Sequence, residues 1–285
     1  MSQTAPLSIW SKLIRQPAAV LGGCISLLAL FLAIAGYWIS PDSSPHANRM
    51  IVEIASRSPG FTQDFLLIPK SPQPPKRNWL ERTVSGQPDP FQFIPIGNWE
   101  VQGDSLIYRQ YIDEGIYDRK SASLQAFGGF DAGTHIVRQK FYLGTDKFGR
   151  DILSRLIIGT RISLLVGGIA MLLSLTIGLL LGTLAGYYGG RYDQAITWLI
   201  NVIWSIPTLL LVFAITLLLG KGFWQVFIAV GLTMWVNVAR LVRGQLIAMR
   251  NLEYVEAARA LGYRDMRIIL RHILPNIMGP VLVVA

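Results

Sequence analysis

Few side chains in this sequence have a type and spacing suited to chemistry, and the clearest candidate is a glycine-containing segment. Gly144-Thr-Asp-Lys-Phe-Gly149-Arg150-Asp151 has the glycine spacing of a phosphate-binding loop. Arg150 and Asp151, however, stand where a lysine and a hydroxyl residue would have to reach phosphate and magnesium. We therefore expect no nucleotide site at this segment.

The sequence also gives no support for a metal, redox or catalytic site. The histidines, His46, His135 and His272, are scattered, and the single cysteine, Cys24, excludes a disulfide or a CxxC site within the chain. The apolar stretches contain neither paired acids nor a histidine cluster, as a membrane-embedded enzyme would need. The sequence thus predicts no catalytic residue, no metal ligand and no cofactor bound by this chain.

The most informative polar segment lies near the C-terminal end. Asn251 to Gly262 is predicted to be a short helix, with Asn251 as its cap, acidic residues in its first turn and Gly262 as its end. Asp265 is expected to begin a second helix that Pro275 limits.

Two interpretations of this segment are equally supported by its residues. A short helix followed by a glycine turn can form a rigid knob that inserts into a cleft of another protein, with Glu256 setting its orientation. Alternatively, it is an interfacial helix held on anionic lipid by nearby arginines. These arginines are Arg264, Arg267 and Arg271.

The composition indicates whether these residues lie in a soluble or a membrane protein. Of 285 residues, 52% are hydrophobic and only 15% are charged, below the roughly 25% charged share of soluble domains. The net charge of +9 is compatible with an anionic membrane or with nucleic acid. The long apolar runs favour the membrane, and we expect no nucleic-acid partner.

The first apolar run, Pro17 to Ile39, is long enough to span a bilayer. Lys12 and Arg15 precede it, which indicates a cytoplasmic N-terminus. The alternative is a cleaved signal peptide, but the run exceeds the usual length of a signal-peptide core.

Three further spans are predicted, at Leu156–Tyr188, Ala195–Gly220 and Phe223–Ala239. Their alternation places residues 40–155 outside and the arginine-rich segment from residue 240 inside. We expect a last span that begins after Pro275 and is not completed within the remaining ten residues.

Three parts follow from these spans: residues 1–41 with an anchor helix, an insert at 42–142, and a core at 143–285. The insert is rich in prolines and aromatics, and residues 99–111 alternate around a Gly103-Asp104 turn, which predicts a β-hairpin. Its aromatics are expected to form its own core more readily than a docking surface. The fold class is therefore an all-α polytopic membrane bundle with a small, mostly β extracytoplasmic insert.

Within the spans, Gly178, Gly182 and Gly186 share a helix face and are expected to pack against another helix. The few polar or helix-breaking residues could line a pathway; they are Asn201, Pro207 and Asn237. Arg161 is expected to snorkel towards the outer edge.

Glu256-Ala257-Ala258-x3-Gly262, followed by Leu274-Pro275, resembles the EAA loop of permease subunits in bacterial ATP-binding-cassette importers. The segment 143–151 and Ser205-Ile206-Pro207 resemble the dipeptide, oligopeptide and nickel branch, more specifically its C-type permease. The sequence departs from the family pattern at His272 and Asn201.

This resemblance implies a type I permease bundle in the bacterial inner membrane whose residues Glu256, Ala257, Ala258, Gly262, Leu274 and Pro275 couple to an ATPase. It also implies partners: a second permease subunit in a heterodimer, two ATPase subunits that bind ATP and Mg, and an extracytoplasmic solute-binding protein. A non-transport membrane scaffold with an extracytoplasmic binding domain remains the alternative.

Overall fold

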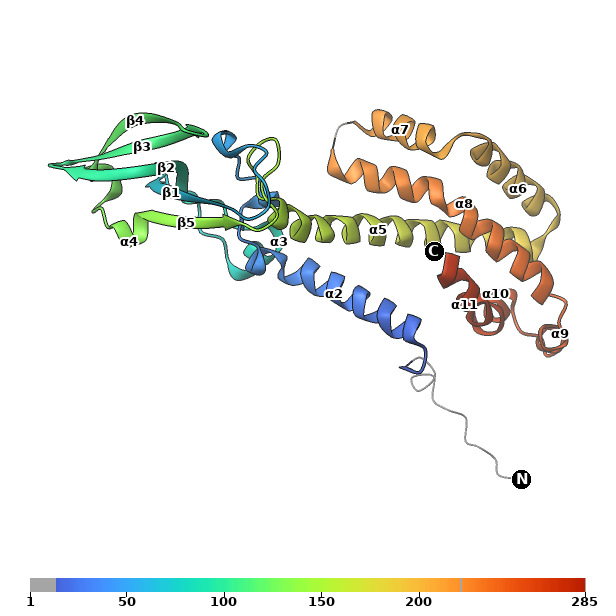
Figure 1. Cartoon of the computed structure of the whole chain (residues 1–285). Helices are drawn as coiled ribbons and strands as arrows, with labels where there is room; N and C mark the ends of the chain where they lie inside the picture. Colours follow the sequence, from blue (N-terminus) through green and yellow to red (C-terminus); the bar gives the residue numbers. More distant parts are fainter. Residues whose placement is uncertain (1–13, 221, 285) are drawn as a thin grey trace, which may run out of the picture. The chain divides into compact units, whose positions relative to one another are not determined.

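The computed structural model describes residues 14–220 and 222–284. They form two compact units, one ending at Leu164 and one starting at Leu165, which we call the sheet unit and the helical unit. Helix α5 (Ile152–Thr183) contributes to both units (Figure 1).

The sheet unit contains a five-stranded antiparallel sheet in the order β4-β3-β2-β1-β5. The strands are β1 (Phe61–Pro69), β2 (Phe91–Gln102), β3 (Ser105–Asp113), β4 (Ile116–Ser123) and β5 (Ile136–Phe141). The predicted hairpin is confirmed, because Trp99 faces Tyr108 and Gln102 faces Ser105 across the Gly103-Asp104 turn.

Both faces of this sheet are covered by apolar side chains. Because successive residues of a strand point to opposite faces, Phe65 and Leu67 of β1 join one buried cluster and Leu66 joins another. The ring of Phe65 lies 6.0 Å from that of Phe93 and 6.2 Å from that of Phe141. The expectation that aromatics build the core of this part is confirmed for these rings.

Helix α2 (Pro17–Ile39) has the predicted bounds of the first span. Three short helical segments and two further helices accompany it: η1 (Pro45–Ala47), η2 (Val52–Ile54), η3 (Leu124–Phe127), α3 (Trp79–Ser85) and α4 (Ala132–His135). Trp38 Nε1 donates a hydrogen bond to Thr83 Oγ1 at 2.9 Å, and the Arg82 guanidinium lies 4.3 Å from the Trp38 ring centroid. These contacts join the end of α2 to α3. Lys12 precedes the described residues.

The helical unit continues α5 through a π-helical turn, η4 (Leu184–Tyr188). Its other elements are α6 (Gly190–Ser205), α7 (Thr208–Leu219), α8 (Phe223–Met249), α9 (Glu253–Ala260), α10 (Asp265–Ile268), the π-helical turn η5 (Ile269–Ile273) and α11 (Leu274–Val284). Most described residues are helical, as expected, and the sheet unit supplies the β content.

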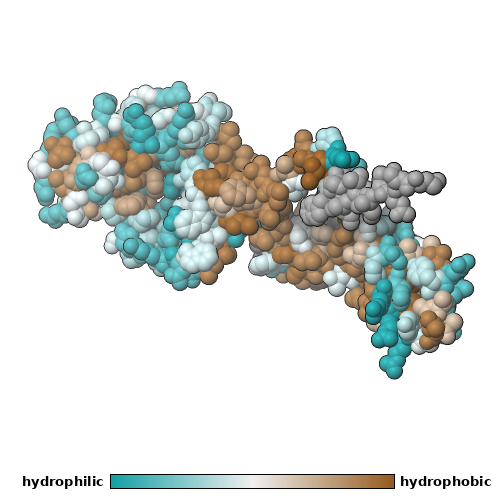
Figure 2. Space-filling view, turned by 90° about the horizontal axis from the view of Figure 1, so that it is seen from below, coloured by the Kyte–Doolittle hydropathy of each residue, from teal (hydrophilic) through white to brown (hydrophobic). Residues whose placement is uncertain are grey.

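Among the described residues, four helices are long and apolar enough to cross a membrane: Pro17–Ile39, Ile152–Tyr188, Trp224–Met249 and Asp265–Val284. The space-filling view shows brown, apolar side chains over much of the helical segments, whereas the sheet surface is largely teal and white (Figure 2). Leu217 and Leu218 are 78% and 86% exposed. Apolar exposure on this scale indicates a surface covered by lipid or protein.

The predicted span over Ala195–Gly220 consists of two helices, α6 and α7. α6 and α7 are bent by 95° at a short break, where Ile206 N–H bonds the Ile203 carbonyl and Pro207 begins α7 as its N-cap. Proline lacks the N–H that would continue the hydrogen-bond ladder. α6 begins at Gly190, five residues before the apolar run that starts at Ala195.

The expected end of a span at Ala239 is also wrong, because α8 continues to Met249. Val242 and Leu246 extend its buried stripe, and the charge of Arg243 is paired with Asp193 Oδ2 at 2.8 Å. These tertiary contacts therefore stabilise the helical conformation beyond Ala239, where arginines interrupt the apolar run.

Pro275 does not end the helix that Asp265 begins. It occupies the second position of α11, directly after the π-helical turn η5, and a missing N–H is tolerated where the hydrogen-bonding pattern changes. Consequently, the last candidate span runs from Asp265 to Val284 instead of starting after Pro275.

Candidate functional site

Helix α9 has two different faces. Val255 and Ala258 are 0% and 5% exposed and join a buried cluster with residues of α8, α10 and η5. Glu256 and Ala257 are exposed on the other side, and Leu261 just beyond is 74% exposed. One face of α9 is thus packed against the helical unit, and the other face is exposed.

The two ends of α9 are formed differently. The prediction that Asn251 caps the helix is wrong, because Leu252 is the N-cap and no side chain caps the helix. Glu253 and Glu256 in the first turn instead interact favourably with the helix dipole.

At the C-terminal end, Gly262 has a φ of +80°, a conformation that residues with a Cβ avoid. Its N–H bonds the Arg259 carbonyl at 3.0 Å, and the Tyr263 N–H bonds the Ala258 carbonyl at 3.2 Å. This pair of bonds is the Schellman motif, so the predicted role of Gly262 as helix terminator is confirmed.

The other loop residues lie on a separate element. Leu274 is half-buried against the same cluster, and Pro275 is exposed, both on α11. His272, where the sequence departs from the family pattern, stacks its ring on Tyr263 with centroids 6.1 Å apart and an interplanar angle of 11°.

Three polar contacts in the helical unit could not be foreseen from the sequence. Tyr187 donates to Asp265 Oδ1 at 2.7 Å, and Arg250 Nη1 donates to the Gly186 carbonyl at 3.2 Å. The third is the Arg243–Asp193 pair described above. All three join residues far apart in the chain, and no spacing rule links them.

The three glycines, Gly178 and Gly182 of α5 and Gly186 of η4, pack against α8, as expected. A Cβ at Gly178 would lie 2.6 Å from Val238 Cβ, and one at Gly182 would lie 2.8 Å from Val242 Cβ. At Gly186 the neighbour is Leu246 Cβ, at 2.7 Å. Since both helices advance by similar steps in the same direction, α5 and α8 run parallel.

The candidate pathway residues are not brought together. Asn237 lines a groove of about 210 Å³ in the helical unit, together with residues such as Ser174 and Met234. Asn201 is exposed on α6, and Pro207 lies at the α6–α7 bend. No hydrogen bond joins any two of the three within the described part of the chain.

Arg161, which is expected to snorkel, is half-buried and contacts other residues of the sheet unit. Its guanidinium donates to the Thr83 carbonyl and lies 5.7 Å from the Tyr37 ring centroid. Contacts with protein therefore hold this head group.

The Gly144–Asp151 segment folds around the carboxylate of Asp146. Asp146 Oδ1 accepts from the Phe148 and Arg150 N–H groups at 2.9 and 3.0 Å, and Oδ2 accepts from Arg150 Nε at 2.7 Å. Partial burial acts to raise the pKa of Asp146, but Arg150 and these N–H groups outweigh it and hold the pKa below its usual value. The Asp146 carboxylate thus already accepts hydrogen bonds from the backbone N–H groups that a phosphate would need.

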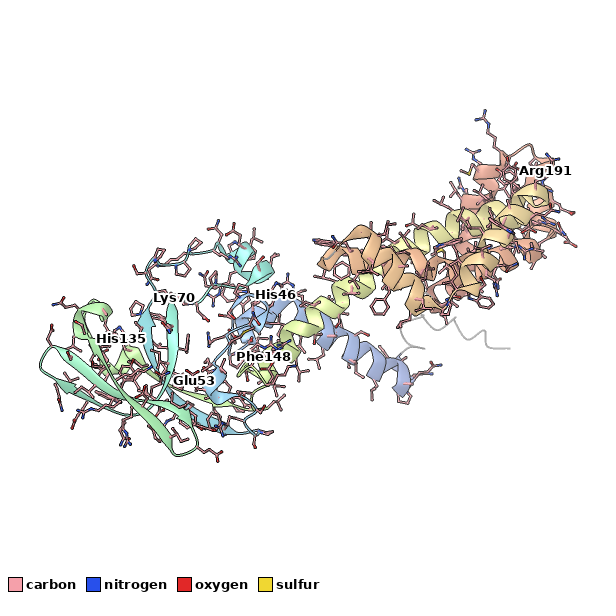
Figure 3. The ribbon with its side chains drawn as sticks, turned by 90° about the horizontal axis from the view of Figure 1, so that it is seen from above. His46, Glu53, Lys70, His135, Phe148 and Arg191 are labelled. Carbon is pink, nitrogen blue, oxygen red and sulfur yellow. The ribbon has the colours of Figure 1, made fainter. Side chains whose placement is uncertain are left out.

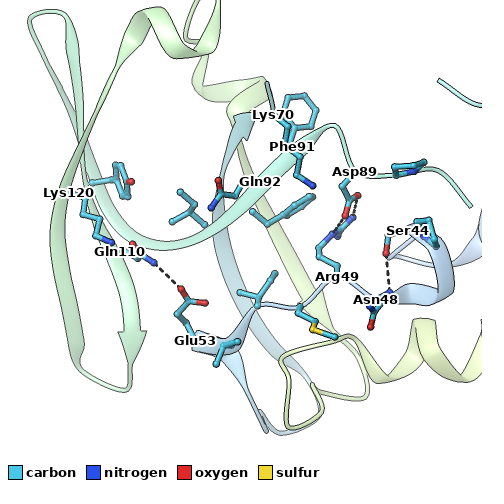
Figure 4. A pocket seen from close by; sticks show the side chains of 18 residues that line it. Ser44, Asn48, Arg49, Glu53, Lys70, Asp89, Phe91, Gln92, Gln110 and Lys120 are labelled. Atoms are coloured by element: carbon cyan, nitrogen blue, oxygen red, sulfur yellow. Dashed lines mark hydrogen bonds and ion pairs between the residues drawn. The ribbon is translucent and has the colours of Figure 1, made fainter. Parts of the chain in front are cut away.

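The sheet unit also contains an open hollow of about 750 Å³. Within it, Arg49 forms a bidentate pair with Asp89 at 2.8 and 2.6 Å, and Gln110 donates to Glu53 at 3.0 Å (Figure 4). Burial acts to lower the pKa of Arg49, but Asp89 and Asp42 outweigh it and raise the pKa. These charges stabilise the fold, because each is engaged by a neighbouring side chain.

The histidines remain apart, as their scatter in the sequence indicates. His46 and His135 lie on separate elements of the sheet unit (Figure 3). No group of three or more metal-ligating side chains occurs among the described residues.

Comparison with known proteins shows what the helical part is similar to. Residues 178–285 match the family described as "Binding-protein-dependent transport system inner membrane component". This range contains α6 to α11, with α9 and its glycine turn. The motifs and the match agree on a membrane permease.

Three relatives show which transport permeases the chain is similar to. The oligopeptide transport system permease protein OppC of Bacillus subtilis is 42% identical over 142 residues, which cover 50% of this chain and 47% of that protein. The dipeptide transport system permease protein DppC of the same species is 42% identical over 142 residues, or 50% and 44% of the two chains. The inner membrane ABC transporter permease protein YejE of Escherichia coli is 42% identical over 137 residues, or 48% and 40%.

The matched region spans about half the length of these relatives. Over that region, the resemblance to C-type permeases of the dipeptide and oligopeptide branch is confirmed.

Proposed function

We propose that this chain is a transmembrane permease subunit of an ATP-binding-cassette importer for peptides or a related small solute. The observation that carries the proposal is α9, which buries Val255 and Ala258 in the helical core and presents Glu256 and Ala257. A short, anchored and exposed helix suits insertion into a groove of another protein. The names of the relatives support peptides as the solute.

In this proposal, the chain forms half of the translocation path with a second permease subunit. ATP and Mg bind to two separate ATPase subunits, whose motion reaches the bundle through α9 and drives alternating access. Asn201, Pro207 and Asn237 contribute to the path, and a solute-binding protein delivers the solute from outside.

The proposed orientation has the N-terminus and α9 in the cytoplasm and the sheet unit outside, in a bacterial inner membrane. Basic residues concentrate on the cytoplasmic side of membrane proteins, and α8 ends among three of them: Arg240, Arg243 and Arg250. The exposed Arg264, Arg267 and Arg271 then lie where they can also contact anionic lipid.

Affinity purification of the tagged chain from its native host, in mild detergent, tests the assembly. A second permease and ATPase subunits are expected to co-purify. Glu256→Gln removes a charge from the exposed face of α9 and is expected to lower ATPase recovery at least tenfold, since an interfacial charge contributes on the order of 2 kcal/mol or more.

Glu100→Gln is the control, because it makes the same change at an exposed residue of the sheet unit, outside α9, and should leave recovery within about twofold. Membrane insertion should be equal for both variants. Equal recovery of the ATPases with both variants refutes the assignment of Glu256. Recovery of the wild-type chain without any ATPase favours the scaffold alternative.

A further inference from the structure

Tyr187 connects the end of a membrane span to the segment that follows α9. It lies in the π-helical turn η4 at the end of α5 and is 8% exposed. Its hydroxyl donates to Asp265 Oδ1 at 2.7 Å. Asp265 is the first residue of α10 and lies three positions beyond Gly262.

The same turn is contacted from α8 and α9. Arg250, at the end of α8, donates to the Gly186 carbonyl. The guanidinium of Arg259, in the last turn of α9, lies 6.0 Å from the Tyr187 ring centroid. Val255 and Ala258 belong to the buried cluster that includes Tyr187. Residues of α8, α9 and α10 therefore all contact η4, the turn that continues α5.

Both π-helical turns of the helical unit contribute to this cluster, η4 through Tyr187 and η5 through Ile269 and Ile273. Single π-helical turns are rare and occur frequently at functional sites. Because apolar contacts are non-directional, they hold the elements together without fixing one relative position. A hydrogen bond to a carboxylate is directional and strong.

We propose that the Tyr187–Asp265 hydrogen bond is the contact that transmits displacement of α9 to α5, which makes Tyr187 a positioning residue for transport. This inference rests on the proposed function and adds a residue outside the EAA loop to its mechanism. It separates two roles: the exposed face of α9 binds the ATPase, and Tyr187 couples that binding to the span.

The test uses the assembled complex, reconstituted in lipid vesicles with its ATPases and binding protein. Tyr187→Phe keeps the ring in the cluster and removes the hydroxyl, which donates to Asp265 and also interacts with Arg259. ATPase recovery and the rate of ATP hydrolysis are expected to stay within about twofold of wild type, while the solute imported per ATP falls about tenfold, as expected for one lost bond to a charged group.

Tyr188→Phe is the matched control. Tyr188 is the neighbouring residue, is 46% exposed, and its hydroxyl has no hydrogen-bond partner among the residues described. This variant should import as much solute per ATP as wild type. Asp265→Ala should reproduce the coupling loss of Tyr187→Phe, and the double variant should be no worse than Tyr187→Phe alone, because each single variant already removes the Tyr187–Asp265 hydrogen bond.

Wild-type coupling in Tyr187→Phe, or additive losses in the double variant, would overturn the inference while leaving the proposed function intact. Equal losses of hydrolysis and import would also overturn it, since they indicate a purely structural role. If the wild-type chain recruits no ATPase, the proposed function fails and the inference fails with it.

Discussion

Asp146 organises the loop before α5 with a single carboxylate that accepts hydrogen bonds from Arg150 and two backbone amides. Its pKa in the folded chain lies below the usual 3.8. The stabilisation is therefore present above pH 3.8 and is lost as the pH falls through the lower pKa of the folded state.

We expect Asp146→Asn to destabilise the fold by roughly 2 kcal/mol at pH 7, the contribution of hydrogen bonds to a charged group. The difference from wild type should shrink as the pH falls below 3.8. Thermal unfolding of the detergent-solubilised chain at several pH values measures this. Asp118→Asn is the control, because Asp118 is exposed and its carboxylate lies 3.9 Å from Lys120 Nζ. A loss equal to that of Asp146→Asn would contradict the explanation.

At the scale of elements, the contact of α5 with α8 depends on the absence of side chains at the glycines. Gly182→Ala would bring a Cβ within 2.7 Å of the Ala239 carbonyl oxygen, and relieving such overpacking typically costs about 1–3 kcal/mol. Gly168→Ala, on the same helix, meets nothing within 4 Å and should stabilise the chain by up to about 1 kcal/mol through helix propensity. Thermal unfolding of the two variants should give shifts of opposite sign, and shifts of the same sign would exclude close packing as the cause.

The same elements explain how much the sequence could predict. The hairpin around Gly103-Asp104 and helix α2 were predictable, because an alternating pattern and a long apolar run are local signals. The extension of α8 to Met249 was not, since it depends on the pairing of Arg243 with Asp193. Likewise, α9 was recognised from its residues, but Tyr187 stands in an apolar run, and only the fold reveals its partner Asp265.

At the scale of the whole molecule, the parallel direction of α5 and α8 constrains the membrane topology. Two consecutive spans that run in the same direction require the chain to return between them. The described elements between α5 and α8 are the turn η4 and the bent pair α6–α7. We therefore expect the pair to carry the chain back across the bilayer as a broken span. Such a crossing agrees with the proposed cytoplasmic position of α9.

Single-cysteine labelling in intact cells tests this topology. With Cys24 changed to serine, Asp104→Cys in the β2–β3 turn should react with a membrane-impermeant maleimide. Ala257→Cys, on the exposed face of α9, should react only after the membrane is permeabilised. Labelling of both positions from the same side would mean that α6–α7 re-enters without crossing, and it would place α9 out of reach of a cytoplasmic ATPase. Opposite labelling makes the bent pair a true crossing, because no other described segment between α5 and α8 can return the chain.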